Sequence, residues 1–184
     1  MKWIKDQEFI RGNVPMTKFN IRILAMAYLS IKEGDRLLDI GAGTGSLSIE
    51  AALQGAETWA IEREEEGIEL IHKNEKKFGV DIDIIKGQAP EDLPDKRFNK
   101  CFIGGSGGQL PSIFKYLDSH LEDQGILCGN FIMLKNLEKF QELLKIYKYK
   151  NIEIQLIQAS YLDHIGLLRG NNPIFIIKGV KSND

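Results

Sequence analysis

Two kinds of segment alternate along the chain. Short apolar runs predict buried strands at Arg36–Ile40, Thr58–Glu62, Ile82–Lys86, Lys100–Ile103 and Ile126–Met133. Longer stretches, in which apolar residues recur at intervals of three and four, predict helices at about Gly45–Gln54, Glu64–Phe78, Gln109–Leu121 and Asn136–Tyr147. Because strands that alternate with helices form mostly parallel sheets covered on both faces, we expect a doubly wound α/β fold.

The two ends of the chain depart from this alternation. Near the C-terminus, Ile152–Ala159 and Pro173–Val180 are two further strand candidates. The connecting residues 160–172 are too few and too rich in glycine for a crossover helix, so a seven-stranded sheet with an antiparallel C-terminal strand is expected. Before the first strand, Thr17 can cap a helix whose apolar face would carry Ile21, Leu24, Tyr28 and Ile31.

Length and composition are those of an ordinary globular domain. The chain has 184 residues, of which 43% are hydrophobic and 27% charged, enough to bury a core without a disulfide scaffold. We expect one domain, residues 1–184, with a short N-terminal cap segment at about 1–30. The chain has no apolar stretch long enough to span a bilayer and no signal-peptide pattern, which predicts a cytoplasmic protein without membrane contact.

Charge and cysteine usage exclude further classes. The formal net charge of −2 argues against a broad electrostatic grip on nucleic acid, so no nucleic-acid partner is expected. Cys101 and Cys128 fall within apolar runs and lack the spacing of a metal site, which favours buried thiols. The three histidines are scattered, and we predict no metal ion.

The strongest chemical signal is the run 37–45, where an apolar strand leads into three alternating glycines and then a helix. Glycines take positive φ and carry no side chain, so a ligand can approach the backbone while N–H groups at the helix start face it. Glu62, at the end of the next strand, can accept hydrogen bonds from both hydroxyls of a ribose. Together these features predict a nucleoside site. The alternative is a tight turn without a ligand beside a solvated strand end.

The spacing of the glycines bears on which nucleoside is bound. The dinucleotide fingerprint requires a glycine three positions after its second one, and Ser46 stands there instead. The run resembles motif I of Class I S-adenosylmethionine methyltransferases, in which an acidic residue stands two before the first glycine. This resemblance implies a Rossmann-like methyltransferase with S-adenosylmethionine as cofactor. The implied contacts are Asp39, Gly41, Ala42, Gly43, Thr44, Gly45 and Glu62, with Ala89 in the loop after the third strand beside the adenine.

Two other stretches carry a closer resemblance. Residues 8–18, which include Val14-Pro15-Met16-Thr17-Lys18, and residues 102–108 after the fourth strand are similar to the CbiT family of cobalamin biosynthesis. The resemblance covers almost the whole chain. It implies an enzyme that methylates C15 of a cobalt-precorrin or precorrin tetrapyrrole, removes the carboxyl group of its C12 acetate side chain, and assembles as a homotetramer.

The resemblance also suggests which residues contact ligands. Thr17 lies in the segment that packs over the cofactor in that family, and its hydroxyl can make a polar contact there. The candidates for anchoring the tetrapyrrole are Arg11, Lys18, Gly104, Gly105 and Arg169. The arginines offer a fork for carboxylates, and the glycines leave room for a flat ring at the carboxyl edge of the sheet. No acid–base pair stands out, so the catalytic residues stay unassigned.

Two alternatives from other classes stay open. One is an RNA or other small-molecule methyltransferase, although an RNA enzyme is expected to show a basic surface and this chain has 24 Lys+Arg against 26 Asp+Glu. The other is a non-catalytic protein that binds S-adenosylmethionine as a sensor. Turnover with a corrinoid intermediate separates both from the main interpretation.

Overall fold

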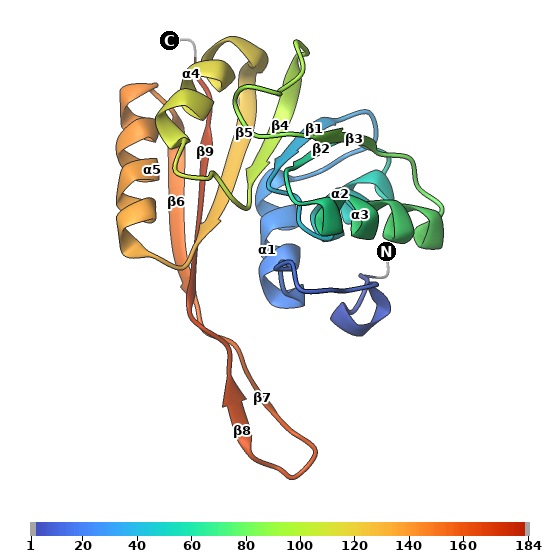
Figure 1. The fold of residues 1–184 in the computed structure, drawn as a ribbon. Helices are drawn as coiled ribbons and strands as arrows, with labels where there is room; N and C mark the ends of the chain where they lie inside the picture. Colours follow the sequence, from blue (N-terminus) through green and yellow to red (C-terminus); the bar gives the residue numbers. More distant parts are fainter. Residues whose placement is uncertain (1–2, 183–184) are drawn as a thin grey trace.

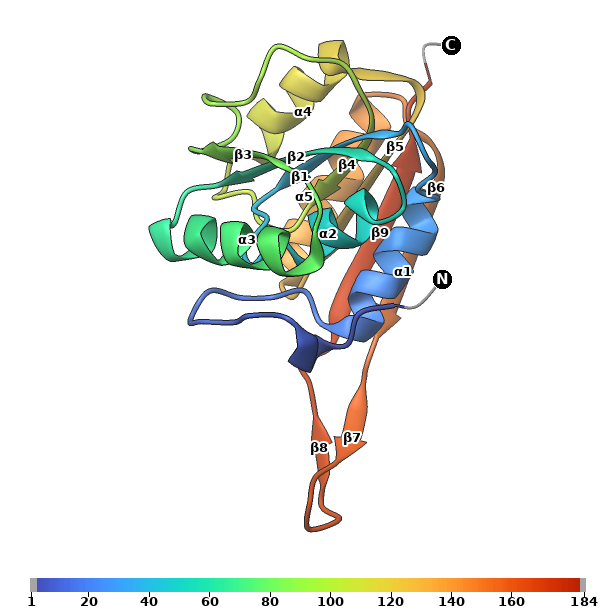
Figure 2. The same cartoon turned by 90° about the vertical axis from the view of Figure 1, so that its right-hand side faces the viewer.

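A central seven-stranded sheet with helices on both faces organises the computed structural model, which describes residues 3–182 (Figures 1 and 2). Residues 1–2 and 183–184, the ends of the predicted domain, lie outside the described residues. The strands of this sheet are β1 (Arg36–Ile40), β2 (Glu57–Glu62), β3 (Asp83–Lys86), β4 (Phe98–Ile103), β5 (Leu121–Phe131), β6 (Lys150–Ile157) and β9 (Ile174–Val180).

The order of the strands is β3-β2-β1-β4-β5-β9-β6. All neighbouring pairs from β3 to β5 are parallel, whereas β9 is antiparallel to both β5 and β6. The predicted mostly parallel sheet with an antiparallel C-terminal strand is therefore confirmed. Because β1 and β4 are neighbours while the helices that follow them pack on opposite faces, their carboxyl ends mark the part of the sheet where ligands of open α/β folds bind.

Helices cover both faces of the sheet. They are α1 (Phe19–Leu29), α2 (Ser46–Ala52), α3 (Glu65–Phe78), α4 (Leu110–His120) and α5 (Leu134–Ile146), with a short 3-10 helix, η1 (Asp6–Glu8). Successive residues of a strand point to opposite faces. On β1, Leu38 and Ile40 belong to the core shared with α4 and α5, while Leu37 packs with α1 and α2. Because both faces of the sheet are buried, the sequences of its strands are continuous apolar runs.

The start of α1 corrects one expectation. The helix begins at Phe19, with Lys18 at the N-cap position and no side-chain cap. The predicted cap by Thr17 is wrong, because the N-cap position falls on Lys18. The backbone carbonyl of Thr17 accepts a hydrogen bond from Arg22 Nη1 at 2.8 Å. Ile31 lies two residues beyond the last residue of the helix, Leu29, although both are buried in one cluster.

The C-terminal part contains two short strands that its sequence pattern does not indicate. Residues 160–172, which were expected to connect two strands without a crossover helix, include the paired strands β7 (Ser160–Leu162) and β8 (Leu168–Gly170). Figures 1 and 2 both show this hairpin projecting beyond the sheet from the ends of β6 and β9. We call residues 158–172 the arm.

Three further features bear on function. Within residues 3–182, no helix is long and apolar enough to cross a membrane, and no group of three or more His, Cys, Asp or Glu side chains could hold a metal ion. Cys101 and Cys128 are free and fully buried, which confirms the prediction of buried thiols.

Candidate functional site

The turn between β1 and α2 needs its glycines for two separate reasons. Gly41, Gly43 and Gly45 have φ values of 73°, 59° and 73°, a region that favours glycine. A Cβ atom on Gly41 would lie 2.7 Å from the backbone nitrogen of Gly105, and one on Gly43 would lie 2.5 Å from the carbonyl oxygen of Pro15. The turn is therefore packed against the loop after β4 and against the N-terminal segment.

Four amides of this turn donate hydrogen bonds within the protein. The N–H groups of Gly41 and Ala42 both donate to the carbonyl oxygen of Ile61, at 3.0 and 3.1 Å. The N–H of Gly43 donates to Glu62, and that of Gly45 to the carbonyl of Ala42. These four amides are therefore engaged within the protein, while the contact of helix-start N–H groups with a ligand stays a prediction. A diphosphate would need such donors, so the turn does not suit a dinucleotide.

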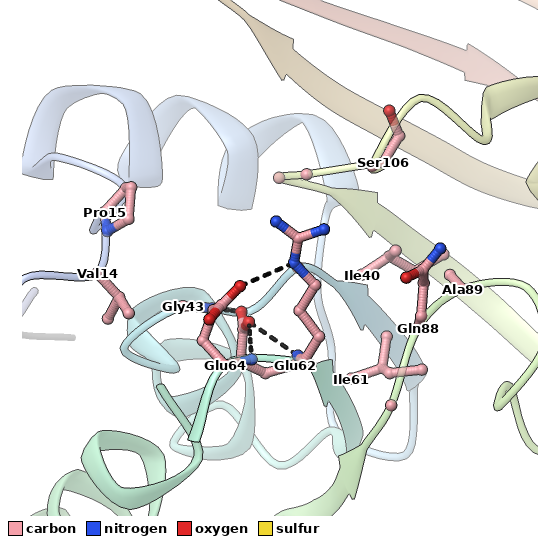
Figure 3. Close-up of a pocket in the computed structure, with 16 residues that line it drawn as sticks. Val14, Pro15, Ile40, Gly43, Ile61, Glu62, Glu64, Gln88, Ala89 and Ser106 are labelled. Carbon is pink, nitrogen blue, oxygen red and sulfur yellow. Dashed lines mark hydrogen bonds and ion pairs between the residues drawn. The ribbon is translucent and has the colours of Figure 1, made fainter. Parts of the chain in front are cut away.

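A cavity of about 260 Å³ opens beside the turn, at the carboxyl edge of the sheet (Figure 3). Ile40 and Ile61 give it apolar walls, and Val14 and Pro15 close one side. Six of the predicted site residues line it, namely Gly41, Gly43, Glu62, Ala89, Gly104 and Gly105. None of the described residues that line it belongs to α2.

Glu62 is the principal polar group of this cavity, and its carboxylate is held by backbone amides. Oε2 accepts from the N–H of Gly43 at 2.8 Å, and Oε1 accepts from the N–H groups of Arg63 and Glu64 at 2.8 and 3.0 Å. Gly67 of α3 makes room for it, because a Cβ atom there would lie 2.6 Å from Glu62 Cγ. A carboxylate has about four acceptor positions, so Glu62 can still accept a hydrogen bond from a ligand hydroxyl.

Three predicted cofactor contacts lie behind the turn rather than on a cavity wall. Asp39 is 1% exposed, and its Oδ2 accepts a hydrogen bond from Ser48 Oγ at 2.6 Å. Burial raises the pKa of Asp39 to about 7, with the negative charge of Glu62 adding to the effect and the Ser48 hydrogen bond opposing it. Thr44 and Gly45 are also buried and line neither this cavity nor the one next to it. These residues support the shape of the turn.

A second cavity, of about 320 Å³, adjoins the first. Both are lined by Pro15, Gly41, Gly104, Gly105 and Ser106, so they meet where the turn and the loop after β4 touch. The second cavity adds three predicted site residues, Thr17, Lys18 and Ala42.

Most other walls of the second cavity come from residues that the sequence analysis did not single out. These are Asn130, Phe131, Ile132, Met133 and Asn136, at the end of β5 and the start of α5. Ile132 is 63% exposed and Met133 61% exposed, an unusual state for large apolar side chains. The available signal was their position directly after a central strand, where ligands of open α/β sheets bind.

The predicted tetrapyrrole anchors are only partly brought together. Arg11 and Lys18 line a further cavity of about 410 Å³, between the N-terminal segment and the base of the arm, whose walls include Asn171 and Asn172. Arg169 lies on β8 in the arm, where it is exposed and pairs with Asp163 at 3.0 Å. It lines none of these three cavities. Its role as an anchor stays a prediction.

The strand order, the glycine-rich turn, the carboxylate at the end of β2 and the second cavity next to the first define a Rossmann-like methyltransferase. Residues 8–181 match the family described as "Precorrin methyltransferase domain", and the chain belongs to that family.

Relatives of known name agree with this assignment. The cobalt-precorrin-6B C(15)-methyltransferase (decarboxylating) of Salmonella typhimurium is 38% identical over 95% of this chain and 94% of its own length. The crystal structure of the precorrin-6y C5,15-methyltransferase of Geobacter metallireducens is 31% identical, with a TM-score of 0.89 over 98% of this chain and 97% of that one. The precorrin 8W decarboxylase of Methanobacterium thermoautotrophicum is 27% identical, with a TM-score of 0.85 over 96% and 98%.

Proposed function

We propose that this protein methylates C15 of a cobalt-precorrin or precorrin, with S-adenosylmethionine as methyl donor, and decarboxylates the C12 acetate side chain of the same tetrapyrrole. The observation that carries the proposal is the pair of adjoining cavities that meet at Gly41, Gly104 and Gly105. One cavity has the groups that a nucleoside needs, and the other has an apolar wall suited to a large ring. The names of the relatives supply the substrate class.

The first cavity suits S-adenosylmethionine, which supplies a methyl group on a positively charged sulfur. Glu62 can accept a hydrogen bond from one ribose hydroxyl through the acceptor position that its three amide donors leave free. Ile61 and Ala89 give the adenine ring apolar contacts. Gly41, Ala42, Gly43 and Gly45 donate within the protein, so these four amides offer no donors to a phosphate.

The second cavity suits the tetrapyrrole. Ile132 and Met133 offer apolar surface to the face of the ring, and Asn130 and Asn136 offer amides to its polar edge. Lys18 reaches both this cavity and the one that Arg11 lines, so the two cations are placed for the acetate and propionate groups.

Catalysis in this arrangement rests on positioning. Methyl transfer forms a carbon–carbon bond at C15 as the carbon–sulfur bond breaks, and it needs the two reactants in line and shielded from water. Gly41, Gly104 and Gly105 carry no side chain that would separate the two cavities. For the second reaction, the electron pair of the broken carbon–carboxyl bond passes into the conjugated ring and a proton replaces the lost carbon dioxide.

The proposal is tested by incubating purified protein with labelled S-adenosylmethionine and cobalt-precorrin-6B and following the mass of the product. We expect a gain of one methyl group and a loss of one carbon dioxide. A methyl gain alone would refute the decarboxylase half. Tight cofactor binding without any change in the corrinoid would refute the enzyme and favour a sensor.

Assembly is part of the same proposal. The CbiT resemblance implies a homotetramer, and the arm offers a surface for self-association. Large apolar side chains are exposed along it, namely Tyr161, Leu162, Ile165, Leu167 and Leu168. Contiguous apolar surface of this kind is typical of protein interfaces.

A further inference from the structure

The N-terminal segment lies across the glycine turn. We call residues 3–18 the strap, which runs below α2 and α3 in Figure 2. Ile4 and Phe9 anchor it in a core cluster of α2 and α3 residues. Val14 and Pro15 then form a wall of the nucleoside cavity, and the carbonyl of Pro15 touches the turn at Gly43. The cavity is therefore completed by a segment that is remote in sequence from the turn.

One buried side chain forms hydrogen bonds to both the strap and the turn. Asn74 of α3 is fully buried, and its Oδ1 accepts a hydrogen bond from the N–H of Ile10 at 2.7 Å. Its Nδ2 donates to the carbonyl of Ile10 at 2.9 Å and to the carbonyl of Thr44 at 3.1 Å. The amide thus pairs with one strap residue as a neighbouring strand would, and also binds the turn. A buried amide with these three hydrogen bonds holds one geometry.

We propose that Asn74 is a positioning residue for the methyl donor, because its amide couples docking of the strap to the conformation of the glycine turn. This inference rests on the proposed function, since it takes the cavity beside the turn to be the donor site. A ligand in that cavity contacts strap and turn together. Ligand binding then stabilises the docked strap, and a loosened strap weakens ligand binding by the same free energy.

A neighbouring anchor provides a matched control. Glu66, also on α3, accepts a hydrogen bond from the N–H of Asn13 at 2.7 Å. Its hydrogen bonds among the described residues go to Asn13 alone and do not reach the turn. Removing this carboxylate loosens the strap and leaves the link to the turn intact. Asn74→Leu removes the link while keeping the branched shape of the side chain.

The experiment compares wild type, Asn74→Leu and Glu66→Ala by calorimetric binding of S-adenosylhomocysteine, by steady-state kinetics and by hydrogen exchange. We expect Asn74→Leu to bind the probe roughly tenfold more weakly and to raise KM for the donor more than it lowers kcat. For Glu66→Ala we expect a loss of less than about threefold. In wild type, the saturating probe should slow exchange throughout residues 3–18, and this effect should be lost in Asn74→Leu.

Two results would overturn the inference while the proposed function stands. One is wild-type binding of the probe with unchanged exchange in the strap, which needs no variant and decides the matter if Asn74→Leu does not fold. The other is binding by folded Asn74→Leu that is as tight as wild type. A wild-type protein that binds no S-adenosylhomocysteine would overturn the proposed function and this inference with it.

Discussion

Three backbone amides converge on the carboxylate of Glu62, and this arrangement makes the side chain sensitive to loss of charge. In Glu62→Gln, one acceptor oxygen is replaced by an NH2 group that faces an N–H donor. We expect the affinity for S-adenosylhomocysteine to fall roughly 10- to 100-fold, measured by calorimetry. The control is Glu57→Gln, at the exposed start of the same strand, which should bind as wild type does. Equal affinities in the two variants would show that Glu62 does not contact the ribose.

Asp39 predicts a pH dependence of stability. Its pKa in the folded protein is about 7, above that of an unfolded aspartate. Between about pH 4 and pH 7 the unfolded chain therefore binds fewer protons at this group than the folded one, so the group's contribution to stability falls as pH rises. The fall is at most about 1.4 kcal/mol per pH unit.

The measurement is urea unfolding of wild type and Asp39→Asn from about pH 4 to about pH 8. The advantage of wild type over the variant should shrink as pH rises, because asparagine does not ionise. Ser48→Ala is the control, since losing the hydroxyl that stabilises the charged form should move the fall to higher pH. Parallel curves for wild type and Asp39→Asn would contradict the raised pKa.

At individual positions, the sequence was a sound guide where the spacing of neighbouring residues determines the local structure. The positive φ at Gly41 and Gly43 and the place of Glu62 at the end of a strand follow from a strand-turn-helix pattern, whereas Ala89 was implied by the family resemblance. The pattern does not show that four amides of the turn donate to acceptors within the protein. Asn74 was missed because a polar residue within an amphipathic helix is expected to face solvent. In the structure this side chain is fully buried and hydrogen-bonded to the docked strap.

At the scale of elements, Arg22 ties the strap to α1 and α2. It is fully buried, and it donates to the carbonyls of Ile4 and Thr17 at 2.6 and 2.8 Å. Its Nε lies 3.4 Å from Glu50 of α2, whose side chain is 3% exposed. Arg22→Met leaves that carboxylate buried without its cation, so we expect a loss of roughly 3–5 kcal/mol in the free energy of unfolding.

Urea unfolding at neutral pH measures this loss, and a second substitution checks its cause. Glu50→Gln in the Arg22→Met background removes the unpaired charge while keeping an oxygen that can accept from the N–H of Ile4. The double variant should recover part of the stability. A double variant less stable than Arg22→Met would show that the unpaired carboxylate is not the source of the loss.

Helices and strands were predictable where apolar residues recur along the sequence with a single period. Every helix and sheet strand expected from apolar patterning is present, with ends that differ by a few residues. The largest differences are at β5, which begins at Leu121 through a polar stretch, and in the arm, where two short strands pair at residues 160–170. All residues of β7 and β8 are exposed, so the arm has no buried face to create a pattern.

At the scale of the whole molecule, the site is a product of topology. Loops after β1, β2, β3 and β4 reach one edge of the sheet to form the nucleoside cavity, and the end of β5 extends it toward the second cavity. The strap, which belongs to the N-terminal part of the chain, closes one side of the nucleoside cavity at this edge. A mostly parallel sheet covered by helices could be expected from the alternation of elements, whereas the closure depends on long-range contacts that no local pattern encodes.

The arm carries the prediction that belongs to this scale. Leu162 and Leu168 are partners across its hairpin and are 68% and 65% exposed. Their replacement by serine removes little buried surface from the folded chain, so folding should be unaffected. If copies of the chain associate through the arm, the double variant should give a smaller particle than wild type in light scattering, because the apolar area that the assembly buries is reduced.

Ile146→Ser is the matched control, since Ile146 is 60% exposed but lies in the last turn of α5. It should keep the wild-type mass. Affinity for S-adenosylhomocysteine should be the same in all three proteins, because none of these positions lines the nucleoside cavity. A double variant of unchanged mass would exclude the arm leucines as the contact that holds the assembly together. A monomeric wild type would exclude the homotetramer itself while leaving the proposed chemistry untouched, because both cavities are lined within one chain.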